Sequence, residues 1–102
     1  MSRREKLEKL LTAEPDDVFL NFGLAMELSK EGSREQALGQ FDRVLELDPY
    51  YHAAYYHKAA LLIELGRSDL ARAVLTSGLA ATRAAGDAHA ESEMGELLAG
   101  LS

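Results

Sequence analysis

The side chains that could do chemistry in this sequence are three histidines and some carboxylate pairs, because the chain has no cysteine. A helical zinc site places two histidines four residues apart on one face. His52 and His57 are five residues apart, and His89 lies far along the chain. We therefore expect surface or interfacial roles for the histidines, with no metal site and no cysteine nucleophile.

Neither the acidic pairs nor the glycines form a catalytic pattern. Asp16 with Asp17, and Glu91 with Glu93, have polar neighbours, whereas general acid–base catalysis relies on carboxyl groups tuned by burial. The segment 66–68, Gly-Arg-Ser, suits a turn between helices, and the chain holds no phosphate-binding loop pattern. We predict that the protein is not an enzyme and needs no cofactor.

The elements that carry these residues are predicted to be helices only. The chain has 102 residues, of which 18 are leucine and 16 are alanine, both strong helix formers. Strand-forming residues are scarce, with three valines, one isoleucine and three threonines. This length supports a single domain with a modest core.

Net charge excludes some partners and locations. The chain carries −6, distributed as +1 over residues 1–15, −5 over 16–49, +2 over 50–83 and −4 over 84–102. A phosphate backbone requires a basic face, so we predict no nucleic-acid binding. The sequence begins with alternating charges and leucines, and no apolar run reaches membrane-spanning length, so we expect a cytoplasmic protein without a membrane segment.

Apolar spacing and turn residues predict six amphipathic helices joined by short connections. The first helix has Leu7, Leu10 and Leu11 as its apolar stripe, and Ser2 with Glu5 forms a capping box. Ser33 with Gln36 predicts another box at the start of the third helix. The predicted helices span about 3–13, 17–30, 33–47, 51–65, 68–84 and 87–101, punctuated by Pro15, Gly32, Pro49, Gly66 and Gly86.

The chain aligns with itself after a 34-residue shift. The small residues match, since Ala25 aligns with Ala59 and Ala37 with Ala71. Alanines at these sites let the two helices of a hairpin approach closely. The other matches are Leu28 with Leu62, Gly32 with Gly66, Phe41 with Leu75, Leu45 with Leu79 and, one period earlier, Leu7 with Phe41, Leu11 with Leu45 and Pro15 with Pro49.

This period and these residues resemble the tetratricopeptide repeat (TPR) family, and the resemblance is strongest over 32–49. It implies antiparallel helix hairpins stacked as a short right-handed α-solenoid. The domain would comprise an N-terminal half-repeat helix at 3–14, repeats at 17–49 and 51–84, and a capping helix at 87–101.

Several positions depart from the family pattern. Asn21 stands where the family places a large aromatic, although Tyr55 satisfies that position in the second repeat. The position of Leu24 becomes Lys58, whose stem we expect to pack on leucines while its ammonium reaches water. The position of Val44 becomes Gly78. At the end of the second repeat, Arg83 stands where the family has a proline. In the last helix, Ser92 and Glu93 stand at positions that should be apolar.

The resemblance also implies which residues line the concave surface, because the first helix of each TPR hairpin does so. Some TPR domains grip a peptide carboxylate there with Lys, Arg and Asn, but the corresponding positions here are apolar or aromatic. The implied lining consists of Phe19, Phe22, Gly23, Met26 and Ser29 in the first repeat, and of Ala53, Tyr56, His57, Ala60 and Ile63 in the second.

Two functions therefore compete. The first is a protein-interaction module whose apolar groove binds a peptide or helix of a partner protein. The second is self-association, as a homodimer or scaffold, through the groove or the terminal helices, because a solenoid usually needs about three repeats for stability. The last helix could also cover the groove itself.

Overall fold

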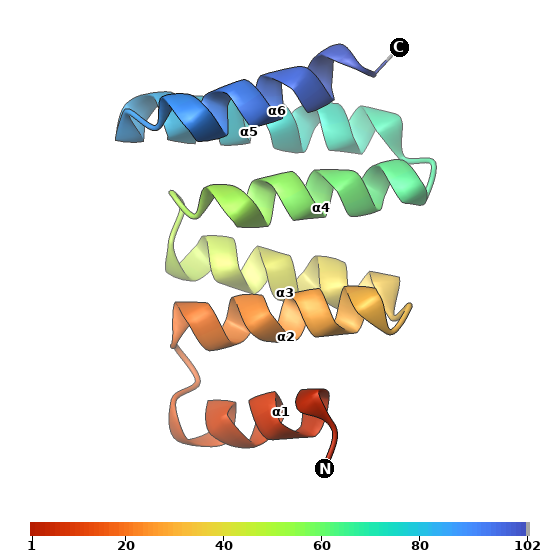
Figure 1. Cartoon of the computed structure of the whole chain (residues 1–102), viewed down its shortest axis with the longest axis vertical. Coiled ribbons are helices and arrows are strands. Elements are labelled where there is room, and N and C mark those ends of the chain that lie inside the picture. Colours follow the sequence, from red (N-terminus) through yellow and green to blue (C-terminus); the bar gives the residue numbers. More distant parts are fainter. Residues whose placement is uncertain (102) are drawn as a thin grey trace. The chain divides into compact units, whose positions relative to one another are not determined.

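The computed structural model describes residues 1–101, and helices are the only regular secondary structure in this range (Figure 1). The prediction of an all-α chain with six helices is confirmed. The helices are α1 (Arg3–Ala13), α2 (Val18–Lys30), α3 (Arg34–Leu47), α4 (His52–Glu64), α5 (Ser68–Ala85) and α6 (Ala88–Ala99).

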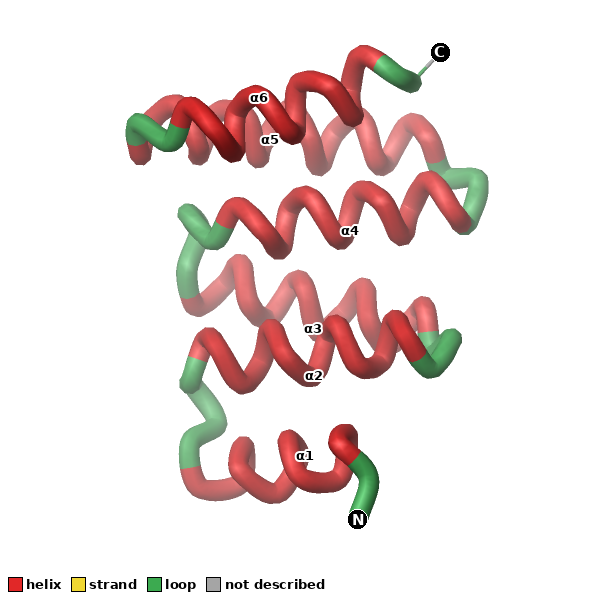
Figure 2. The backbone as a smooth tube through the Cα atoms, in the orientation of Figure 1, coloured by secondary structure: helices red, strands yellow, loops and turns green. Residues whose placement is uncertain are grey.

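The helices belong to two compact units, which divide between Asp48 and Pro49. In the first unit α2 pairs with α3, and α1 packs against α2. In the second unit α4 pairs with α5, and α6 packs mainly against α5, with a smaller contact to α4. Short loops join the successive helices within each unit, so neighbouring helices run antiparallel (Figure 2).

Fully buried alanines occupy the matched repeat positions of the paired helices. Ala25 and Ala37 in the first unit, and Ala59 and Ala71 in the second, have no exposed surface. Larger side chains fill the space on either side of these positions. They are Leu24, Leu28, Phe41 and Val44 in the first unit, and Leu61, Leu62, Leu75 and Leu79 in the second.

Three glycines close helices in the same way. Gly32, Gly66 and Gly86 have φ angles of 88°, 74° and 72°, in the left-handed region that favours glycine. After each one, the next backbone N–H returns to a carbonyl of the finished helix, as in a Schellman motif. The N–H of Ser33 donates to the Leu28 oxygen at 2.9 Å, and the N–H of Asp87 donates to the Thr82 oxygen at 2.9 Å.

Helix starts follow the sequence in part. The box at Ser2 is confirmed, because Ser2 Oγ accepts from the Glu5 N–H at 3.1 Å and the Glu5 carboxylate accepts from the Ser2 N–H. The box predicted at Ser33 is wrong, since its side chain makes no capping hydrogen bond. Ser33 lies directly after Gly32, and its conformation is the one that closes α2 (φ −81°, ψ 64°).

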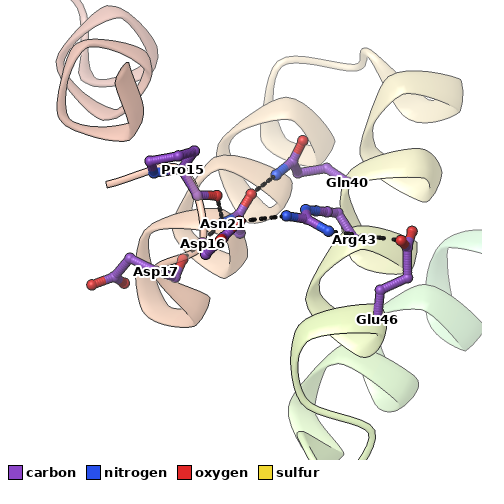
Figure 3. A network of polar contacts seen from close by, with 7 residues as sticks. All are labelled: Pro15, Asp16, Asp17, Asn21, Gln40, Arg43 and Glu46. Atoms are coloured by element: carbon purple, nitrogen blue, oxygen red, sulfur yellow. Dashed lines mark hydrogen bonds and ion pairs between the residues drawn. The ribbon is translucent and has the colours of Figure 1, made fainter. Parts of the chain in front are cut away.

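The departure at Asn21 is explained by a polar network in the first unit (Figure 3). Asn21 is only 4% exposed. Its Nδ2 donates to the carbonyl oxygens of Pro15 and Asp17, at 3.0 and 2.8 Å, and its Oδ1 accepts from Gln40 Nε2 at 2.6 Å. Nearby, Arg43 on α3 reaches Asp16 at 2.6 Å. The amide thus ties the turn before α2 to both helices of the hairpin.

Tyr55 makes the matching bond in the second unit. Its hydroxyl donates to the Pro49 carbonyl oxygen at 2.7 Å. Asn21 and Pro15 become Tyr55 and Pro49 after one repeat period, so two different side chains hold the same turn carbonyl. We call these two bonds the proline-carbonyl latches.

Gly78 is required by its surroundings rather than by its backbone angles. A Cβ at this position would lie 2.6 Å from Met94 Sδ and 2.8 Å from Tyr55 Cβ. Met94 is 1% exposed, so α6 inserts it where the first repeat has Val44. The glycine therefore marks the point where α4, α5 and α6 meet.

Two further expectations can be compared with the structure. Lys58 is partly buried, as its position predicted. Leu10 is 55% exposed and does not belong to the buried stripe of α1, which consists of Leu7. The reason is geometric, because Leu7 lies against Gly23 of α2 while Leu10 lies on another side of the helix.

The latches should contribute unequally to stability. Asn21→Leu removes three hydrogen bonds at a buried site and should lower the free energy of unfolding by about 2–3 kcal/mol. Tyr55→Phe removes one bond that water can replace, and should cost about 0.5–1 kcal/mol. Urea unfolding measures both. Thr76→Val, which removes an exposed hydroxyl bond, should stay within about 0.5 kcal/mol of wild type, and equal losses for all three variants would contradict the assignment.

Gly78 and Gly39 should respond to alanine in opposite directions. Gly78→Ala forces Tyr55 and Met94 apart and should destabilise the protein by about 1–3 kcal/mol. Gly39 lies on the exposed side of α3, where a Cβ meets nothing within 4 Å. Gly39→Ala should therefore stabilise by about 0.5–1 kcal/mol through helix propensity. Thermal unfolding distinguishes the two, and a Gly78→Ala variant as stable as Gly39→Ala would show that the three-helix contact is not tight.

Candidate functional site

The first candidate surface is a stripe of α2 that we call the α2 face, formed by Phe19, Phe22 and Met26. These residues are spaced at i, i+3 and i+7, so they share one side of the helix. Phe19 is 75% exposed, and Phe22 and Met26 are partly exposed. The Phe22 ring rests on Phe41 of α3, with 6.1 Å between the ring centroids and 56° between the planes.

Gly23 does not belong to this surface, although the family resemblance implied that it would. A Cβ at Gly23 would lie 3.3 Å from Leu7 Cδ2, so the position faces α1. Two ion pairs reinforce that contact, from Arg3 to Glu27 at 3.3 Å and from Arg4 to Glu31 at 3.0 Å. The α2 face is therefore bordered by α1 on one side.

The second candidate surface is a stripe of α4 that we call the α4 face, formed by five residues. All five are partly exposed. Tyr56 and His57 lie at the centre of this face. Their ring centroids are 5.5 Å apart and their ring planes meet at 82°, which is an edge-to-face arrangement. The face consists of Ala53, Tyr56, His57, Ala60 and Ile63.

Each face lies beside a buried stripe on the same helix. Leu24, Ala25 and Leu28 of α2 are buried against its hairpin partner. Since α2 is apolar around most of its circumference, one apolar stripe enters the core and another reaches the surface. Such a surplus of exposed apolar side chains is typical of a binding surface.

The last helix approaches the α4 face at one edge. Burial lowers the pKa of His57 below its ordinary value of 6.5. The carboxylate of Glu93 on α6 acts in the other direction but is the smaller of the two effects. Glu93 also lies 3.2 Å from His89 Nε2. The sequence left open whether α6 covers the predicted surface, and in the structure all five residues of the α4 face keep some exposure.

The histidines and acids form no metal-binding cluster in the part of the chain that the structure describes. His52 pairs with Asp87 at 3.5 Å, while His89 pairs with Glu93 on the same helix. Within residues 1–101, no helix has the length and apolar character needed to cross a bilayer.

Two hairpins with buried alanines at matching repeat positions define a helical-repeat protein, and comparisons with known proteins agree. The sequence model of the tetratricopeptide repeat family matches residues 28–92, more than half of the chain. The chain is 34% identical over 90 residues to a TPR repeat-containing protein of Pseudomonas aeruginosa, covering 88% of this chain and 86% of that protein. This chain belongs to the tetratricopeptide repeat family.

Other relatives share parts of the sequence or the whole fold. A protein of Methanocaldococcus jannaschii is 40% identical over 55 residues, which are 54% of this chain and 64% of that protein. A solution structure from Bordetella parapertussis, 29% identical, has a TM-score of 0.86 and covers 99% of this chain and 88% of that one. The crystal structure of PcrH has a TM-score of 0.87 and covers 96% of this chain and 74% of that one, and its 21% identity limits the likeness to the fold.

The burial of His57 should appear in the pH dependence of stability. The folded chain holds the pKa of His57 below 6.5, so the unfolded chain takes up the proton more readily. Above the pKa that His57 has in the unfolded chain, the ring is neutral in both states and its ionisation does not affect the free energy of unfolding. Below that pKa the unfolded chain binds the proton more readily, so the free energy of unfolding falls as the pH drops. We expect His57→Gln to lose less stability than wild type between about pH 7.5 and about pH 5.5 in urea unfolding. Identical losses for both proteins would contradict the burial of this ring.

Proposed function

We propose that this protein is a non-catalytic interaction module in which the α2 face and the α4 face are each a binding surface for a peptide or helix of a partner protein. The observation that carries the proposal is the exposure of Phe19, 75% of whose surface is open, in line with Phe22 and Met26. A lone exposed phenylalanine needs no explanation, but an aligned apolar stripe is the surface that amphipathic helices and extended segments recognise.

The aromatic residues have the properties of binding anchors. Phe22 is held on Phe41, and Tyr56 is held against His57, so both rings are positioned before a partner arrives. Pre-positioned aromatic rings lose little conformational entropy on binding and often dominate interface energetics. We therefore assign the largest share of affinity to Phe19, Phe22 and Tyr56.

The chemistry of the two faces indicates what kind of segment they accept. None of their eight residues is a lysine or an arginine, so neither face offers a permanent cation for a terminal carboxylate. Apolar and aromatic side chains of the partner are the groups that these residues can bury. The ring of His57 adds one polar site at the centre of the α4 face.

Membership of the TPR family supports this proposal, because its members are generally non-catalytic interaction modules. PcrH, which shares the fold, was crystallised with the chaperone binding region of PopD. The fold is thus used to bind a segment of another protein. A second candidate function is self-association through the terminal helices, which the exposed Leu10 on α1 favours.

The two faces can be tested with peptides selected against the wild-type protein from a random phage-displayed library. Phe19→Ser and Tyr56→Ala should each weaken the selected peptides by about tenfold or more, measured by fluorescence anisotropy. Phe19 is the sharper test because its exposure leaves the fold intact when it is changed.

Leu70→Ser is the matched control, since Leu70 is 55% exposed on α5 and belongs to neither face. Circular dichroism checks that all three variants stay folded. Peptides that bind Phe19→Ser and Tyr56→Ala with wild-type affinity, or that lose as much on Leu70→Ser, would overturn the proposal.

A further inference from the structure

The first helix has the spacing of a second helix of a hairpin, but one of its sides is open. Leu10 aligns with Val44 after one repeat period and with Gly78 after two. Val44 has no exposed surface, and Gly78 is buried between Tyr55 of α4 and Met94 of α6. Leu10, at the same position, is 55% exposed. We call the side of α1 that carries Arg3, Lys6 and Leu10 its outer side.

The last helix has the complementary character. Its residues His89, Glu93 and Glu96 align with Tyr55, Ala59 and Leu62, which lie on the first helix of the second hairpin. In α6 these positions are polar and accessible, with the His89 side chain 86% exposed and the Glu93 side chain 48% exposed. We call this side of α6 its outer side.

The two outer sides carry opposite charge. Four basic and two acidic residues lie in α1, and Arg3 and Lys6 are on its outer side. Arg3 also pairs with Glu27 of α2, and 70% of its side chain stays exposed. Three glutamates and no lysine or arginine lie in α6, and Glu93 and Glu96 are on its outer side. An arrangement that brings these sides together pairs unlike charges, and one that brings two copies of either side together opposes like charges.

The hairpins of this chain show which positions would meet. Tyr55 faces Gly78, and because a Cβ on the glycine would lie only 2.8 Å from Tyr55 Cβ, this pair shows which positions oppose each other but not the spacing that two side chains need. Transferred by the period, this pair becomes His89 and Leu10.

The polar contact of the first hairpin gives a second pair. Asn21 accepts a hydrogen bond from Gln40, and these positions become His89 and Lys6 after the same transfer. The buried alanines Ala25 and Ala37 correspond to Glu93 and Arg3. Lys6 and Arg3 would thus both approach the acidic side of α6.

We propose that the outer side of α6 docks on the outer side of α1 in a second copy, so that the two helices complete a hairpin between molecules. Leu10 is then covered, Arg3 lies opposite Glu93, and Lys6 lies beside His89 at the acidic side of α6. The association is head to tail, so it extends as a linear chain unless it closes into a ring. It rests on the second candidate function, self-association through the terminal helices, and names which helix faces pair; it uses neither the α2 face nor the α4 face, so its failure leaves the first candidate function untouched.

Because the natural chain has no cysteine, disulfide trapping can test this pairing without background. Leu10→Cys and His89→Cys are made in separate proteins, which are oxidised alone and as an equimolar mixture. The two positions oppose each other in a hairpin, and a spacing somewhat wider than the 2.8 Å at Gly78 gives the Cβ separation of about 3.5–4.5 Å that a disulfide requires. We expect the mixture to give a disulfide-linked heterodimer, and each variant alone to give little dimer. A mixture without heterodimer, or Leu10→Cys dimers in equal yield, would overturn the head-to-tail pairing.

A charge exchange tests the register on the same trapped species. Arg3→Glu in the Leu10→Cys protein should lower the heterodimer yield about fivefold or more, because Arg3 lies opposite Glu93 in this pairing. Adding Glu93→Lys to the His89→Cys protein should restore the yield. The matched control is Lys9→Glu, the same charge change on the same helix, which should leave the yield unchanged. Equal losses from Arg3→Glu and Lys9→Glu, or no recovery on the exchange, would contradict the pairing.

Discussion

The close approach of the two helices in each hairpin is the constraint on which the rest of this structure depends. Ala25 and Ala37, and their equivalents Ala59 and Ala71, have no exposed surface. Because these sites hold only methyl groups, the larger apolar residues of α2 and α4 must lie elsewhere around each helix. Some, such as Leu24 and Leu62, enter the core, and others, such as Phe19 and Tyr56, reach the surface. The same constraint that builds the hairpin thus leaves the α2 face and the α4 face open.

The close approach also requires that the ends of the helices be held in place. Three left-handed glycines return the chain after α2, α4 and α5. The proline-carbonyl latches hold the turns before α2 and α4, with Asn21 in one unit and Tyr55 in the other. One position therefore keeps one task while its side chain changes from an amide to a phenol. Gly78 also helps to hold a helix in place, because the absence of a Cβ leaves room for Met94 of α6.

The sequence predicted the features that depend on neighbours along the chain. Helices, glycine turns and the alanine sites follow from local propensity and from the repeat period. The features that it missed depend on contacts between separate segments. In the sequence, Gly78 departs from the family pattern because the side chain that fills its space, Met94, lies on the next helix. Asn21 departs from the pattern too, and its reason is equally invisible in the sequence, because its hydrogen-bond acceptor is the Pro15 carbonyl oxygen. Leu10 fitted the apolar stripe of α1, yet its side of the helix is open. The family resemblance implies the residues of the two faces, and their role in binding stays a prediction.

The apolar stripes left open on α2 and on α4 are each a proposed binding surface. The most direct measurement is a cross-saturation NMR experiment, in which a selected unlabelled peptide is irradiated while bound to the deuterated, amide-labelled protein. The account predicts that amide signals around Phe19, Phe22, Met26, Tyr56 and Ile63 lose the most intensity. Attenuation concentrated instead on α3 and α5, with these signals unchanged, would contradict it.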